Sequence, residues 1–116
     1  MGVRFVSIQS IAKSLATEVT KTKEYHNMME MKGKLYNNPK IGVQAKVYEQ
    51  EQLKIVQSKA SSKEKQMKMN QLQKQSSSLL NSREMMSYQQ SANEFQQKIF
   101  EIFQILSQEI NKSVTR

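Results

Sequence analysis

The sequence contains no cysteine and no aspartate, and has one histidine, one proline and three glycines among 116 residues. Without cysteine there are no disulfides, thiolate metal ligands or thiol nucleophiles. Because turn-forming residues are so few, many short strands are hard to connect and long helices are favoured. The most apolar run, residues 99–106, is interrupted by Glu101 and Gln104. We therefore expect an all-α, cytoplasmic protein with no membrane insertion.

The same shortages leave little for catalysis. His26 is the only histidine, so a serine–histidine–acid arrangement would have to use glutamate as its acid. Gly33 and Gly42 stand alone, and no glycine-rich phosphate loop is present. The Glu-x-x-His motif of di-metal helical bundles is also missing. We expect no enzymatic activity, no cofactor and no metal site, and His26 is more simply a partly exposed helix residue.

Hydrophobic periodicity divides the chain into five expected helices within one domain, residues 1–116. They are expected to form helical hairpins or a bundle that ends in a long C-terminal helix. The expected helices are residues 7–19, 22–36, 40–58, 62–80 and 82–113. Whether the first two are one bent rod stays open, because no strong helix breaker lies between them.

Turn and capping residues mark the helix ends. Asn38 tolerates a tight turn, and the fixed φ of Pro39 suits the first position of the third helix. Ser7 is expected to cap the first helix, and Ser61 and Glu64 have the spacing of a capping box. Asn81 precedes Glu84 by the same interval and is expected to form the turn before the final helix and to cap that helix.

Apolar residues on the third and last helices follow heptad spacing. The stripe on the third helix consists of Ile41, Ala45, Tyr48, Gln52 and Ile55. The seam on the last helix is unbroken and consists of Met85, Tyr88, Ala92, Phe95, Ile99, Ile102 and Leu106. Phe100, Phe103 and Ile105 widen the apolar surface of the last helix near its end.

The last helix has more apolar surface than its own chain should be able to cover. At ~1.5 Å per residue it is roughly 45 Å long, which exceeds what a compact core of this size needs. We therefore expect a second chain to pack against it, as a homodimer. The residues expected in interfaces or helix packing are Tyr48, Gln52, Ile55, Tyr88, Ala92, Phe95, Ile99, Ile102, Phe103 and Leu106.

The charge is uneven along the chain. Residues 1–75 hold 14 Lys or Arg against 6 Glu, a net +8, whereas residues 76–116 hold 4 of each, a net charge of zero. The basic part could meet phosphate or an acidic protein, or its lysines could simply keep helix faces solvated. The methionines likewise suit either core packing or an adaptable binding surface.

Several segments together resemble the YlbF/YmcA family of small bacterial helical proteins. They are the amphipathic segment Ile8 to Val19, Thr22-Lys23-Glu24-Tyr25, Leu35-Tyr36-Asn37-Asn38-Pro39, Tyr48 with Gln52, and Leu80-Asn81-Ser82 with Tyr88, Ala92 and Phe95. The resemblance covers nearly the whole chain. The second turn departs from the family pattern, since Asn81-Ser82 stands where Asn-Pro is frequent.

The resemblance implies an all-α fold that tends to dimerise and acts as a regulatory adaptor. Members are tied to competence, sporulation and biofilm formation, through a complex that acts with a membrane-bound endoribonuclease on RNA maturation. Some members of that complex bind iron–sulfur clusters through cysteines, which this chain lacks. The expected function is thus a non-enzymatic adaptor that binds proteins, and the alternative is a basic helical protein that binds nucleic acid.

Overall fold

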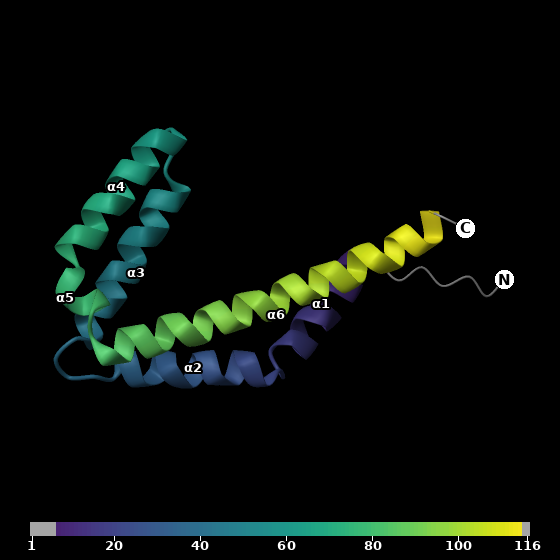
Figure 1. Ribbon diagram of the computed structural model, residues 1–116, viewed down its shortest axis with the longest axis horizontal. Coiled ribbons are helices and arrows are strands. Elements are labelled where there is room, and N and C mark those ends of the chain that lie inside the picture. Colours follow the sequence, from purple (N-terminus) through teal and green to yellow (C-terminus); the bar gives the residue numbers. More distant parts are fainter. Residues whose placement is uncertain (1–6, 115–116) are drawn as a thin grey trace. The chain divides into compact units, whose positions relative to one another are not determined.

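The computed structural model describes residues 7–114, and all the regular secondary structure in that range is helical (Figure 1). The helices are α1 (Ile8–Val19), α2 (Lys23–Tyr36), α3 (Gly42–Gln57), α4 (Ser62–Gln75), α5 (Ser77–Leu80) and α6 (Arg83–Val114). The expected all-α class and the long C-terminal helix are both confirmed. Within residues 7–114, each helix is too short or too polar to cross a membrane.

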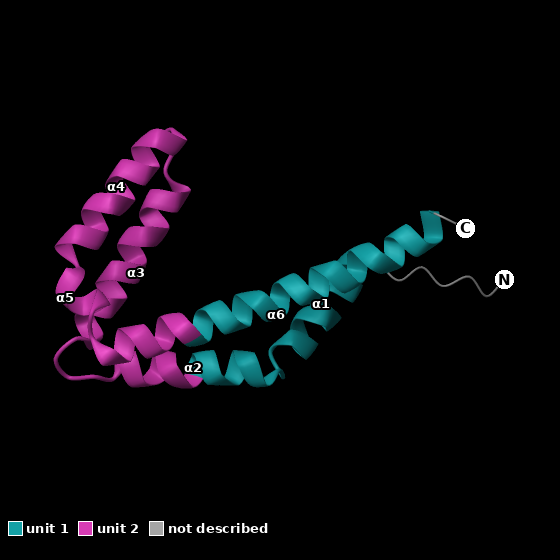
Figure 2. Cartoon of the chain, viewed as in Figure 1, with its two compact units in different colours: residues 1–29, 91–116 teal, residues 30–90 magenta. Residues whose placement is uncertain are grey.

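The chain divides into two compact units (Figure 2). Unit 1 comprises residues 1–29 and 91–116, and unit 2 comprises residues 30–90. Two helices belong partly to each unit, because α2 continues past residue 29 and α6 begins before residue 91.

Two of the expected helix caps are present. The Ser7 hydroxyl accepts a hydrogen bond from the backbone N–H of Ser10 at 3.0 Å, and the Ser61 hydroxyl accepts one from Glu64 at 3.2 Å. A cap that we did not predict separates the first two helices, where the Thr22 hydroxyl accepts from the N–H of Tyr25 at 3.2 Å. These bonds satisfy N–H groups that have no partner inside a helix. The first two helices are therefore separate and do not form one bent rod.

The expected cap of the final helix is wrong by one residue. Ser82, not Asn81, accepts a hydrogen bond from the N–H of Met85, at 3.2 Å. Asn81 forms the predicted turn, but its φ of −92° and ψ of 0° make it the C-cap residue of α5, with its N–H donating to the carbonyl oxygen of Ser77. An N-cap residue needs extended backbone, which Asn81 does not have.

Pro39 does not open the third helix as expected. The Asn38 side chain accepts hydrogen bonds from the N–H groups of Lys40 at 2.8 Å and Ile41 at 3.2 Å. Those bonds hold residues 39–41 as a turn, so α3 begins only at Gly42.

The single helix expected over residues 62–80 is interrupted. Ser76 has φ −104° and ψ 18°, outside the helical region, and it separates α4 from the one-turn α5. Residues 76–78 are three consecutive serines, whose hydroxyls compete for backbone hydrogen bonds and weaken a helix at this point.

The core of the described chain lies in unit 2 and draws on α2, α3, α5 and α6. Its buried apolar residues are Leu35, Ala45, Tyr48, Leu79 and Met85, and the half-buried residues packed on them are Tyr36, Ile41, Leu72, Leu80 and Tyr88. Burial of one such large side chain stabilises a fold by about 1.5–3 kcal/mol. Three of these buried residues, Ala45, Tyr48 and Met85, belong to the predicted heptad stripes of the third and last helices.

Gly42 allows the backbones of α2 and α3 to approach closely at their turn. A Cβ atom at this position would collide with the carbonyl oxygen of Tyr36 and lie 2.9 Å from its carbonyl carbon. Gly33 in α2 is different, because a Cβ atom there would have no other atom within 4 Å.

This contrast predicts opposite effects for two identical substitutions. Gly42→Ala should lower the free energy of unfolding by about 1–3 kcal/mol, because the two backbones must move apart. Gly33→Ala should raise it by about 0.5–1 kcal/mol, because alanine favours the helix. Urea denaturation followed by circular dichroism measures both, and equal effects of the two substitutions would contradict the close approach at Gly42.

Candidate functional site

The described residues include few side chains of the kinds that act in catalysis or bind metal ions. His26 is exposed, and its ring is an edge-on neighbour of Tyr25, with ring centroids 6.1 Å apart. Within residues 7–114, no group of three or more His, Cys, Asp or Glu side chains could hold a metal ion. The features that remain are apolar hollows and uncovered helix faces.

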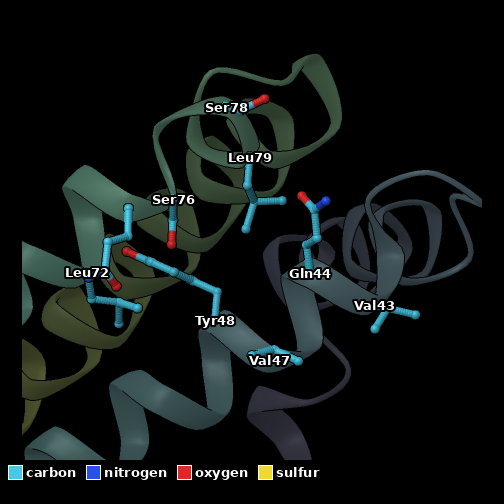
Figure 3. Close-up of a pocket in the computed structure, with 9 residues that line it drawn as sticks. Val43, Gln44, Val47, Tyr48, Leu72, Ser76, Ser78 and Leu79 are labelled. Atoms are coloured by element: carbon cyan, nitrogen blue, oxygen red, sulfur yellow. The ribbon is translucent and has the colours of Figure 1, made fainter.

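A large hollow in unit 2 lies beside Tyr48, between α3 and the α4–α5 segment (Figure 3). Its volume is about 450 Å³. Apolar side chains from both sides line it, with polar groups at residues 44, 75, 76 and 78; the apolar ones are Val43, Val47, Tyr48, Leu72 and Leu79. Val43 is 75% exposed and Val47 is 49% exposed, so the α3 wall of the hollow is open to solvent.

Tyr48 lines this hollow and also belongs to the core. Its side chain is 4% exposed, and its hydroxyl accepts a hydrogen bond from Nε2 of Gln52 at 3.3 Å. Burial raises the pKa of the Tyr48 phenol above its ordinary value, because the charged phenolate would lose hydration. The neutral phenol is thus the form that suits the fold.

Tyr36 lies in a second hollow of unit 2, with two lysines near its ring. The ammonium groups of Lys32 and Lys46 lie 5.2 and 5.6 Å from the ring centroid, within cation–π range. Lys32 also pairs with Glu49 at 3.5 Å. Since Lys32 is already paired with a carboxylate, this arrangement mainly holds α2 against α3.

In unit 1, the packing of α6 is tight near residue 91 and becomes open toward its end. Ser91 is 6% exposed, and the Phe95 ring meets Tyr25 edge-on at 5.6 Å. Lys98 pairs with Glu24 at 3.8 Å and with Glu101 at 3.2 Å. The hydrogen bond and charge of Glu101, together with Glu24, raise the pKa of Lys98.

Beyond Glu101, the apolar side chains of α6 are largely uncovered. Phe103 is 58% exposed, Leu106 52% and Ile110 55%. In α1 no residue is buried, and Ile8, Ile11 and Leu15 are 81%, 55% and 43% exposed. Unit 1 therefore presents two amphipathic helices whose apolar faces are incompletely covered.

The predicted interface residues fall into three settings. Tyr48 is buried, and Phe103 and Leu106 are exposed. The others are half-buried: Gln52, Ile55, Tyr88, Ala92, Phe95, Ile99 and Ile102. Tyr48, Gln52 and Tyr88 come together around one small hollow in unit 2, and the later residues follow one another along α6. Their role in an interface stays a prediction.

The sequence pattern missed the open wall of the large hollow. Val43 and Val47 are four residues apart on α3, next to the predicted stripe that contains Tyr48. That spacing places both valines on one side of the helix, which could have indicated a second apolar face.

By its fold and these surfaces, the chain is an all-helical protein whose apolar helix faces are partly exposed to solvent. A family model described as "Control of competence regulator ComK, YlbF/YmcA" matches residues 8–111. The match spans nearly all of the chain, so the chain belongs to this family of regulators, which confirms the resemblance seen in its sequence. No significant match was found among curated proteins or among solved structures.

Burial of Tyr48 predicts a specific dependence of stability on pH. Its raised pKa means that its stabilising contribution is complete below the unfolded-state pKa of about 10 and is lost as the pH rises further. Tyr48→Phe should therefore flatten the loss of stability between about pH 9 and 11, as measured by urea denaturation at each pH.

Gln52→Ala is the control, because it removes the same hydrogen bond and keeps the phenol. Each substitution should cost about 0.5–1.5 kcal/mol at neutral pH. Only Tyr48→Phe should change the alkaline slope; if Gln52→Ala changes it as much, the account of the buried phenol is wrong.

Proposed function

We propose that this chain is a non-enzymatic regulatory adaptor that acts as a homodimer. The observation that carries the proposal is the uncovered apolar face of α6. Membership in a family described by its control of the competence regulator ComK supports a regulatory role.

The exposed residues of α6 form one continuous stripe. Phe103, Leu106 and Ile110 are spaced three and four residues apart, so their side chains share one face of the helix. Each is more than half exposed. Complete burial of one such side chain contributes about 1.5–3 kcal/mol, so covering the stripe gives a strong driving force for association.

The charge of this region favours a second copy of the same chain as the cover. Residues 91–114 carry two lysines and three glutamates, a net −1. Lys112 pairs with Glu109 in its own helix at 3.2 Å. A nearly neutral surface with paired charges neither repels its own copy nor attracts phosphate.

In this proposal the dimer acts in the cytoplasm by holding other proteins. The family resemblance supports a connection to RNA maturation through a ribonuclease-associated complex, and to sporulation and biofilm formation as well as competence. No catalytic step is assigned to the chain.

A second candidate is direct binding of nucleic acid by unit 2. Residues 30–90 carry 11 Lys or Arg and 5 Glu, a net +6, which suits a polyanion. This candidate predicts that affinity for RNA or DNA falls steeply with salt, and filter binding at low salt tests it. No retention of either nucleic acid would dispose of it.

The dimer is tested by one substitution in the stripe and one on the opposite face of α6. Leu106→Glu would bury a charge without a partner, so the dissociation constant should rise by at least about tenfold, ~1.4 kcal/mol. Gln108→Glu adds the same charge to the polar face and should leave the dimer intact. Light scattering at micromolar concentration measures the mass of each variant.

The unaltered chain should have the mass of two copies, and circular dichroism should show equal helix content in both variants. A monomeric unaltered chain at micromolar concentration would contradict the dimer. Equal masses for Leu106→Glu and Gln108→Glu would contradict the assignment of the interface to the α6 stripe.

A further inference from the structure

We propose that the large hollow of unit 2 is a docking site for an acidic amphipathic helix from a partner protein. The inference rests on the proposed adaptor function, because it names the chemistry of the protein that the adaptor would hold. The site is the apolar hollow lined by Val43, Val47, Tyr48, Leu72 and Leu79.

The segment that forms the hollow is strongly basic. Residues 40–80 carry eight lysines and three glutamates, a net +5. Glu51 pairs with Lys54 at 3.3 Å, and Glu49 pairs with Lys32 of α2 at 3.5 Å. The Lys65 ammonium group donates to the carbonyl oxygen of Val56 at 3.0 Å.

Most lysines of this segment are left without a carboxylate. In the part of the chain that the structure describes, seven of the eight form no ion pair: Lys40, Lys46, Lys59, Lys63, Lys65, Lys68 and Lys74. An apolar hollow formed by a segment with this surplus of positive charge is complementary to a partner that combines acidic and apolar side chains.

The exposed side chains favour a protein helix over a nucleic acid. Residues 40–80 contain no arginine, and the tyrosines of unit 2 are buried or half-buried, so bases have no exposed ring on which to stack. Val43 and Val47 line the hollow at 75% and 49% exposure. Side chains spaced three and four residues apart on an amphipathic helix can enter such a hollow.

The occupant must come from another protein, because no helix of the described chain has the required charge. The most acidic described helix, α6, carries four glutamates and three basic residues, a net −1. A helix from a second copy of this chain would therefore leave most of the positive charge of residues 40–80 unmatched.

The test is a fluorescence-anisotropy titration of the full chain with a labelled synthetic helix. The helix is rich in glutamate, about five turns long, and carries leucines at positions i, i+3, i+4 and i+7. A peptide of the same composition in scrambled order has equal charge but no apolar face. An oligouridylate competitor tests for a nucleic-acid surface.

Two valines of α3 supply matched variants. Val47→Glu places a carboxylate in the wall of the hollow, and Val56→Glu places the same charge at a residue of α3 that is 60% exposed and does not line the hollow. Val47→Glu should raise the dissociation constant of the amphipathic peptide by at least about tenfold. Val56→Glu should change it by less than about threefold, and thermal unfolding checks that both variants fold.

The scrambled peptide should bind at least about tenfold more weakly than the amphipathic one. The inference is overturned if the two peptides bind equally, if both valine variants weaken binding alike, or if oligouridylate displaces the peptide at lower concentration than the scrambled peptide does.

Light scattering of the same samples separates this inference from the dimer. A dimeric chain that binds no peptide overturns the docking site alone. A monomeric chain that binds the peptide in the expected way overturns the dimer alone.

Discussion

A helix can bury its apolar face only where another helix covers it, and in unit 1 that cover ends partway along α6. Ser91 is buried and Phe95 packs edge-on against Tyr25, but Phe103 and Leu106 are more than half exposed. One helix thus contributes first to a core and then to an open apolar surface. The proposed dimer follows from this change within a single element.

In unit 2 the apolar helix faces cover one another within the chain, and the surface that stays exposed is of a different kind. Four helices close over Leu35, Tyr48, Leu79 and Met85, and the missing side chain of Gly42 lets the backbones of α2 and α3 meet. What stays open is an apolar hollow formed by residues 40–80, a segment with a net charge of +5. The nearly neutral apolar face of unit 1 and the apolar hollow in the basic segment of unit 2 suit two different partners, in line with the proposed adaptor function.

Most of the fold follows from the sequence, because helical periodicity and capping residues act locally. The stripe through Tyr48 and Gln52 proved to be the inward face of α3. The helix ends were less predictable, since a single side-chain hydrogen bond from Ser82 decides where α6 begins. The hollow beside Val47 could not be predicted, because its other wall depends on the break of α4 at Ser76 and on the packing that follows.

The most direct test of the account is a distance measurement between copies. The chain has no cysteine, so Gln108→Cys gives a single spin-label site on the polar face of α6. With one label in each chain, double electron–electron resonance reports only distances between chains. The account predicts a resolved distance between labels, which Leu106→Glu in the same chain abolishes. If the labelled Gln108→Cys variant shows no defined distance at micromolar concentration, the proposed dimer is contradicted.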